Sequence, residues 1–220
     1  MSAPGLRPSS DVAAADWLKP RLRSFASAVA AVVPDGFPAY VRLAHPAPEQ
    51  DSGNPPLGSL PAELLPVLCA ILAEHTSTAS ACYFCLWEGY GWVQGSPAVM
   101  RLTRRRDDGL PEIIPPPIPP AFSPEVLHGP RVRLPNRDYL LFTGPLDAAP
   151  ELGETLDDTF FPQSPHLFWP QDHAWCVASE IDLTYTLVAG SERLAAALVA
   201  DPSLKGRRVS PGDALTSDAD

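Results

Sequence analysis

Proline, at 28 of 220 residues, is the feature that most restricts how this chain can fold. Proline lacks an amide hydrogen and fixes φ, so it interrupts helices and the inner strands of sheets. Its share is well above the roughly one residue in twenty of ordinary proteins. We therefore predict sparse secondary structure joined by long, conformationally fixed loops. The run EIIPPPIPPAFSP is expected to form polyproline II. Its Pro115–Pro120 tract fits either a ligand for an aromatic groove or internal packing on the domain's own aromatic side chains.

Residues 174–200, AWCVASEIDLTYTLVAGSERLAAALVA, show strand periodicity followed by helical periodicity. Alternation predicts a strand from Trp175 to Leu183, with Trp175 on an apolar face and Glu180 and Asp182 on the opposite face. Ser191 is predicted to cap a helix that ends before Pro202. This segment is expected to contribute much of the core.

Further elements are predicted from periodicity along the chain. The stripe formed by Leu18, Leu22, Phe25, Val29 and Val32 predicts a helix over Asp16–Val33. A second helix is expected from Ser59 to Glu74, with Pro66 delaying its start. Strands are predicted in AYVRLAH, in CYFCLWEGYGWV and in DYLLFTG; the second continues through a bend or pairs with Ala98–Leu102, and the third is expected at the centre of the sheet. The loop DDTFFPQSPHLFWP is expected to lie across the core and bury its rings.

These elements predict an α+β fold. We expect a single domain over residues 13–205, with a mixed, mostly antiparallel sheet packed by two to four helices and joined by long proline-rich loops. Residues 1–12 and 206–220 are expected to be flexible tails.

The composition and the absence of certain motifs disfavour several classes of function. A net charge of −10 disfavours nucleic-acid binding and favours a basic protein partner. No signal peptide and no apolar run of about 20 residues is present, so we expect a cytoplasmic protein rather than a membrane protein. Neither phosphate-binding glycine motif occurs, which disfavours ATP and NAD as cofactors. The arginines at 104–106 are followed by two aspartates and are expected to form a solvated turn.

The cysteines are expected to be buried thiols rather than a metal site. Cys82 and Cys85 have zinc-knuckle spacing, but no second pair completes such a site, and residues three apart in a strand face opposite ways. No metal or cofactor is therefore predicted. Asp172, His173 and Cys176 permit a nucleophile hypothesis, although no nucleophile elbow accompanies them.

Two groups of residues are candidates for function. Glu180 and Asp182, two apart on the predicted strand, have a spacing suited to acid and base chemistry, although two solvated carboxylates are the simpler interpretation. Glu88, Tyr90 and Trp92, in LWEGYGW, fit either a recognition surface or core packing.

FCLWEGYGW, RDYLLFTGPL and AWCVASEIDLTYTLVAGS together resemble a family of proteins from high-GC bacteria, and this resemblance implies no activity or catalytic residue. In its acidic α+β character and its Trp-Glu-Gly, the chain also resembles the SMI1/KNR4-like immunity proteins, which implies neutralising binding of a toxin. We therefore expect a non-enzymatic domain that offers Glu88, Glu180 and Asp182 to a basic partner. The alternative is a small hydrolase that uses Glu180, Asp182 and His173.

Overall fold

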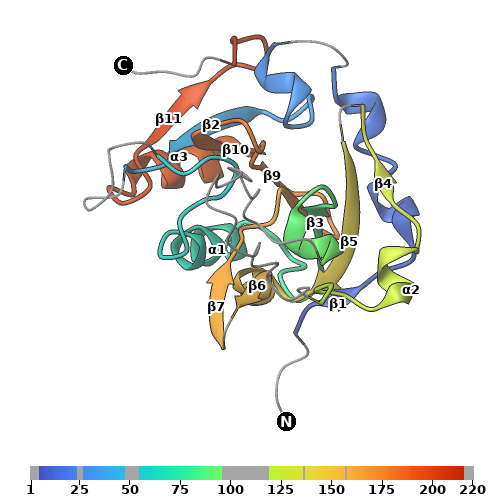
Figure 1. The fold of residues 1–220 in the computed structure, drawn as a ribbon. Coiled ribbons are helices and arrows are strands. Elements are labelled where there is room, and N and C mark those ends of the chain that lie inside the picture. The colour runs from blue at the N-terminus through green and yellow to red at the C-terminus, as the bar shows by residue number, and fades with distance from the viewer. Residues whose placement is uncertain are drawn as a thin grey trace, which may run out of the picture.

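A large antiparallel sheet organises the chain (Figure 1). The computed structural model describes residues 5–23, 27–47, 55–95, 119–135, 137–156 and 158–215. The order of strands across the sheet is β1-β5-β3-β8-β9-β10-β2-β11, and β4 also pairs with β5. The strands are β1 Arg7–Pro8, β2 Ala39–Ala44, β3 Cys82–Trp87, β4 Val132–Arg133, β5 Asp138–Gly144, β8 Leu167–Pro170, β9 Cys176–Ala178, β10 Tyr185–Gly190 and β11 Gly206–Val209. Every pairing among the described strands is antiparallel, which confirms the predicted fold class.

Three α-helices accompany the sheet in the described residues: α1 Leu65–Ala73, α2 Pro124–Leu127 and α3 Glu192–Ala200. α1 and α3 match two predicted helices. The Ser191 hydroxyl accepts a hydrogen bond from the Leu194 amide at 3.1 Å, as expected for an N-cap. α1 begins later than predicted because Pro66 occupies its first turn, where a missing amide hydrogen costs least.

Both faces of the sheet are covered. On one face, α1 and α3 pack against inward side chains of β2, β3 and β9, including Leu43, Phe84 and Val177. On the other, residues near the amino terminus, among them Leu18 and Val33, pack on side chains that include Trp169 and Tyr185. The short strands therefore lie between two hydrophobic layers, which is why apolar residues occupy both faces of β5 and β10.

The predicted helix over Asp16–Val33 is wrong. Its described part consists of short 3-10 turns, η2 Lys19–Arg21 and η3 Val29–Ala31, preceded by η1 Val12–Ala15. The amides of Val29 and Ala30 donate to the carbonyls of Asp213 and Pro211 at 2.9 and 3.0 Å. These bonds to the carboxyl-terminal segment replace helical bonds. The described residues of the predicted stripe are nevertheless largely buried: Leu18, Leu22 and Val29.

The predicted strand from Trp175 to Leu183 is also wrong in extent. β9 ends at Ala178, and the chain turns at Glu180–Asp182, where the Leu183 amide donates to the Glu180 carbonyl at 3.0 Å. β10 then returns beside β9. The carboxylates of Glu180 and Asp182 therefore lie on a hairpin turn rather than on a strand face, while Trp175 is buried as predicted.

Several other expectations change with the sheet order. The expected tails contribute strands, because β1 pairs with β5 and β11 pairs with β2. β5 is not central, since among the described strands only short β1 and β4 lie beyond it.

The aromatic loop is buried only in part. Phe168 and Trp169 are buried in β8, as expected. Phe160 and Phe161 are exposed, because β7 Thr159–Pro162 pairs with β6 Gly153–Leu156 in a separate hairpin. Predictions for Phe25, for Ala98–Leu102, for the arginines at 104–106 and for the prolines at 115–117 concern residues outside the described part.

Candidate functional site at one end of the sheet

Most of the predicted site residues lie on loops at one end of the sheet. Trp87, the last residue of β3, lies opposite Tyr139 in β5. Leu167, which opens β8, lies opposite Ala178, which closes β9. The loops after β3 and β9 and those before β5 and β8 therefore meet here, beside the turn into β10. We call this region, formed by residues 56–60, 87–92, 163–166 and 179–184 with Arg137, the loop end.

Arg137 engages both predicted carboxylates. Its Nε donates to Glu180 Oε1 at 2.7 Å, and its terminal nitrogen lies 2.8 Å from Asp182 Oδ2. The guanidinium carbon also lies 5.2 Å from the centre of the Trp87 ring, within cation–π distance. The side chain of Glu180 is 18% exposed and that of Asp182 is 77% exposed. Of the two carboxylates, only that of Asp182 is largely exposed to solvent. The charges of Glu180 and Asp182 are neutralised in part by Arg137, a cation that sequence patterning did not identify.

A buried histidine, His166, supports Tyr90. The Trp87 amide donates to His166 Nδ1 at 3.1 Å, so the ring proton lies on Nε2, which donates to the Tyr90 hydroxyl oxygen at 3.0 Å. Burial, with a contribution from Arg137, lowers the pKa of His166 to about 3. Burial and the charge of Glu180 raise the pKa of Tyr90 to about 12. The imidazole is thus neutral, and the phenol keeps a proton that it can donate to another acceptor.

Trp92, the third member of the predicted aromatic group, is buried in the core. Its ring stacks on Tyr90 with centres 6.0 Å apart and lies 6.1 Å from the ring of Phe122. Gly89 lets the backbone after β3 pass close to the Trp87 ring, because a Cβ there would lie 2.1 Å from that ring. Trp92 therefore holds Tyr90 in place instead of facing solvent.

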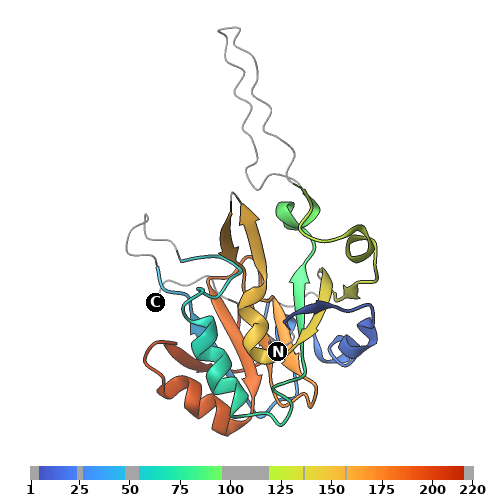
Figure 2. The same cartoon turned by 90° about the horizontal axis from the view of Figure 1, so that it is seen from below.

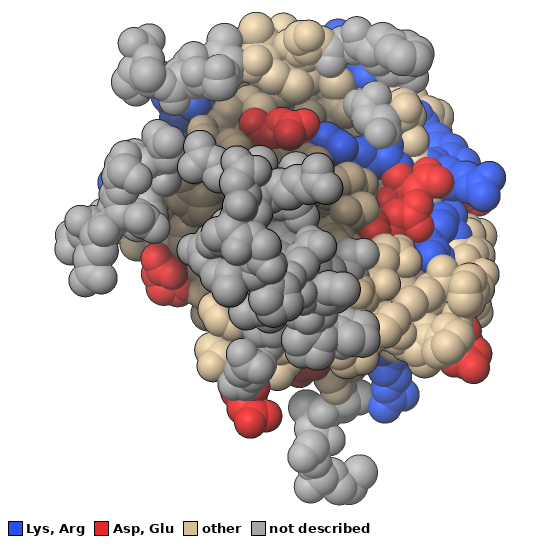
Figure 3. All heavy atoms as spheres, in the orientation of Figure 1, with Lys and Arg blue, Asp and Glu red and all other residues tan. Residues whose placement is uncertain are grey.

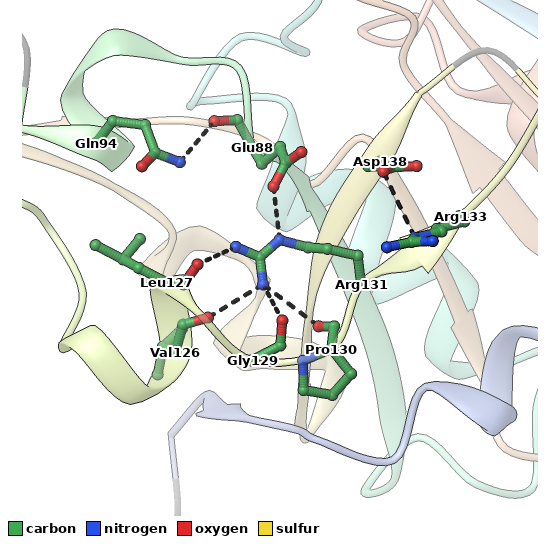
Figure 4. Close-up of polar contacts among 9 residues, drawn as sticks. All are labelled: Glu88, Gln94, Val126, Leu127, Gly129, Pro130, Arg131, Arg133 and Asp138. Atoms are coloured by element: carbon green, nitrogen blue, oxygen red, sulfur yellow. Dashed lines mark hydrogen bonds and ion pairs between the residues drawn. The ribbon is translucent and has the colours of Figure 1, made fainter.

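Glu88 is bound internally as well. Arg131 Nε donates to Glu88 Oε2 at 2.6 Å, and the rest of the guanidinium reaches backbone carbonyls at the end of α2 (Figure 4). The side chain of Arg131 is only 10% exposed. The pair fixes the loop after β3 to the segment before β4, so Glu88 has a structural contact that accounts for its charge.

The predicted catalytic histidine lies away from these carboxylates. His173 precedes β9, whereas Glu180 follows it, and the His173 ring stacks on Trp17 with centres 4.4 Å apart. Desolvation and the charge of Arg21 lower the pKa of His173. Glu180, Asp182 and His173 therefore do not converge on one cleft, and the geometry required for the hydrolase alternative does not form.

The nucleophile hypothesis for Cys176 is not supported by its surroundings. Cys176 is completely buried, and burial raises the pKa of its thiol far above the ordinary value. Asp172 instead accepts hydrogen bonds from the Ser77 amide and the Thr76 hydroxyl, both at 2.8 Å. Among the described residues, no histidine is bound to this thiol.

A second buried polar chain, which sequence analysis did not predict, lies beneath the loop end. His45 Nδ1 lies 2.7 Å from the Pro56 carbonyl, which can only accept, so Nε2 accepts from the Thr186 hydroxyl at 2.9 Å. The Ser179 hydroxyl completes the chain, 2.7 Å from Thr186. All three side chains are buried. These hydrogen bonds therefore join β2, β10 and the end of β9, and their groups are not placed to contact a substrate. No local pattern marks residues so far apart in sequence.

In the part of the chain that the structure describes, no three His, Cys, Asp or Glu side chains gather as metal ligands would. Cys82 and Cys85 project to opposite faces of β3, as predicted. No helix in the described ranges is long and apolar enough to cross a membrane.

Comparison with models of known families, with curated proteins and with solved structures finds no match.

Proposed function

We propose that this protein is a non-catalytic interaction domain that binds a basic protein partner at the loop end. The observation that carries the proposal is the position of its exposed hydrophobic side chains. Four large hydrophobic side chains are exposed in the described residues, and three of them border the loop end: Leu57 at 59%, Phe160 at 46% and Phe161 at 51%. Large apolar side chains that are exposed in the same region of a surface are characteristic of binding sites.

The hairpin and the loop that carries Leu57 are attached to each other. Gln163, at the foot of β7, donates from its side-chain amide to the Gly58 carbonyl at 3.3 Å. Gly58 has a φ of +69°, and a Cβ there would lie 2.6 Å from the Ile181 backbone, so this loop lies directly on the β9–β10 turn. Figure 2 shows the β6–β7 hairpin extending from the body of the protein, separate from the main sheet. Aromatic side chains on such a hairpin are suited to insert into a partner.

The charge of the protein supports a basic partner. The net charge is −10, and Asp158 and Asp182 are exposed at the hairpin turn and at the β9–β10 turn. On the face seen in Figure 3, by contrast, basic and acidic side chains lie next to each other along the side that carries β4. We therefore assign affinity mainly to the phenylalanines and electrostatic steering to the acidic residues.

Quantitative affinity capture tests this function. Wild-type protein is immobilised and incubated with cell extract. It is expected to capture basic proteins, and the amount captured in a fixed time should fall as the salt concentration of the extract rises. Replacing both hairpin phenylalanines (Phe160→Thr, Phe161→Thr) should weaken binding of the retained partner about 30-fold, as expected for loss of about 2 kcal/mol at a hot spot.

The matched control is Val199→Thr, which changes an exposed hydrophobic residue on α3 that is 43% exposed. Asp182→Asn should slow association, whereas Asp16→Asn, on an exposed residue after η1, should not. Retention of no basic protein, or equal losses in the hairpin and Val199 variants, would refute the proposal.

A further inference from the structure

A groove with a volume of about 470 Å³ lies between α1 and η5 Leu146–Glu151. Ala70 and Ala73 of α1 form one side of its lining, and Pro145 and Leu146 form the other. η5 follows β5, so the groove lies at the opposite end of that strand from the loop end. Its volume falls within the range of about 300–1,000 Å³ that is usual for small-molecule sites.

The composition of α1 leaves this groove unusually apolar. The helix reads LPVLCAILA and contains no charged residue. Leu65, Leu68 and Leu72 are buried in the core, whereas Ala70 and Ala73 are exposed towards the groove. A helix that is apolar on all sides is normally covered on all sides. The solvent-facing side of α1 therefore offers apolar surface to a ligand.

Asp147 gives the groove a single charge. Among the described residues that line the groove it is the only charged one, and Ser80 supplies a hydroxyl. Within the described ranges, Asp147 forms no hydrogen bond or ion pair. Burial and the charges of Cys82 and Asp147 raise the pKa of the Cys69 thiol, which also lines the groove, to about 12. Because Asp147 itself lines the groove, its carboxylate can contact a group bound there.

We propose that the groove binds a small organic cation, an amine that carries an aromatic or branched aliphatic body. The apolar lining would bury the body, and Asp147 would accept hydrogen bonds from the ammonium group. Because none of the lining residues that the structure describes is a lysine or an arginine, an anion would meet the negative charge of Asp147 with no positive charge to offset it. The site is independent of the partner surface proposed at the loop end.

Phenethylamine is the probe for this site, and the alanine methyl groups are the reporters. In protein labelled at alanine methyls, titration should shift the signals of Ala70, Ala73 and Ala79, while exposed Ala196 on α3 should not shift. A ligand of this size is expected to bind with a Kd of about 1 mM. Phenethyl alcohol should bind about fivefold more weakly because it lacks the charge, and 3-phenylpropionate should bind least.

Two variants separate charge from shape. Asp147→Asn should remove the preference for the amine over the alcohol and leave the affinity for the alcohol unchanged. Ala73→Leu should fill the groove, so that neither phenethylamine nor phenethyl alcohol shifts the remaining alanine signals. Ala196→Leu should leave the binding of both ligands unchanged. The proposal would be overturned by equal shifts with phenethylamine and 3-phenylpropionate, by the absence of any saturable shift, or by binding of lysine-containing peptides alone. None of these outcomes bears on partner capture at the loop end.

Discussion

Replacing Arg131 tests the structural account of Glu88 most directly. Besides the Glu88 carboxylate, the Arg131 guanidinium donates to the carbonyls of Gly129 at 2.7 Å, Leu127 at 2.5 Å and Val126 at 3.2 Å (Figure 4). Hydrogen bonds to charged groups contribute about 1.5–3 kcal/mol each when buried. Since the Glu88 side chain is 35% exposed, water can replace part of the hydrogen bonding that its carboxylate loses when Arg131 is removed. We therefore expect Arg131→Met, which keeps the apolar stem, to lower the free energy of unfolding by about 3 kcal/mol.

Arg133, two residues along the chain, provides the matched control. Its ion pair with Asp138 is 3.8 Å long and its side chain is 77% exposed. Exposed pairs of this kind contribute little, so Arg133→Met should cost under about 0.5 kcal/mol. Urea unfolding followed by tryptophan fluorescence measures both variants, and the slope with denaturant should stay unchanged.

A double-mutant cycle with Glu88→Gln then separates the carboxylate from the carbonyls. We expect a coupling energy of about 1 kcal/mol between Arg131 and Glu88, because the pair is only partly buried. The remaining loss should persist in the Glu88→Gln background, since it comes from unsatisfied carbonyls. If the two arginine variants cost the same, or if the whole loss vanishes without Glu88, the assigned role of Arg131 is wrong.

Three further predictions concern other parts of the chain. The pKa of His166 is lowered to about 3 in the folded protein, so as pH falls below about 6.5 the unfolded chain takes up the proton first. His166 should then make stability decrease with falling pH by up to about 1.4 kcal/mol per pH unit. Burial also lowers the pKa of His45 and His173, so His166→Asn should reduce, and not abolish, the slope of stability between pH 6.5 and 4.5 in unfolding curves. Ser191→Ala should cost about 1 kcal/mol in urea unfolding and Ser191→Asp much less, because only the latter keeps an N-cap acceptor for Leu194. Burial raises the pKa of Cys69 and Cys82 to about 12, so a disulfide reagent at pH 8 should leave them unmodified in native protein and react with all four cysteines after unfolding; rapid native labelling of either would contradict their burial.

Local patterns predicted the elements that periodicity and caps mark. α1 and α3 follow from helical spacing, proline placement and the Ser191 cap, because helical backbone bonds join residues a few positions apart. β2 and β3 follow from the alternation of buried side chains, although their backbone bonds go to distant strands that no local pattern identified. The predicted helix over Asp16–Val33 is wrong although the described residues of its apolar stripe are largely buried. The amides of Val29 and Ala30 bond to the segment at 211–213 instead, and no pattern within a helix-length window reports such a partner.

Prediction of the candidate site was likewise incomplete where positions depend on contacts between distant segments. Glu180 and Asp182 were placed on a strand because alternation continues through the β9–β10 turn, where neither glycine nor proline marks the change of direction. The arginines that bind the predicted acids are each 43 residues from the glutamate that they contact. Their positions depend on the order of strands in the sheet, which the sequence did not determine for us.

The two arginines also change what the loop end offers a partner. Glu88, Glu180 and Asp182 carry three negative charges, and Arg131 and Arg137 return two positive charges, so this group has a net charge of about −1. The loops after β3 and β9 are thereby fixed in place, and little conformational entropy is lost when a partner binds to them. A proposed partner would then gain affinity from the exposed phenylalanines rather than from the acidic residues. Raising the salt concentration should therefore slow its association more than it speeds its dissociation.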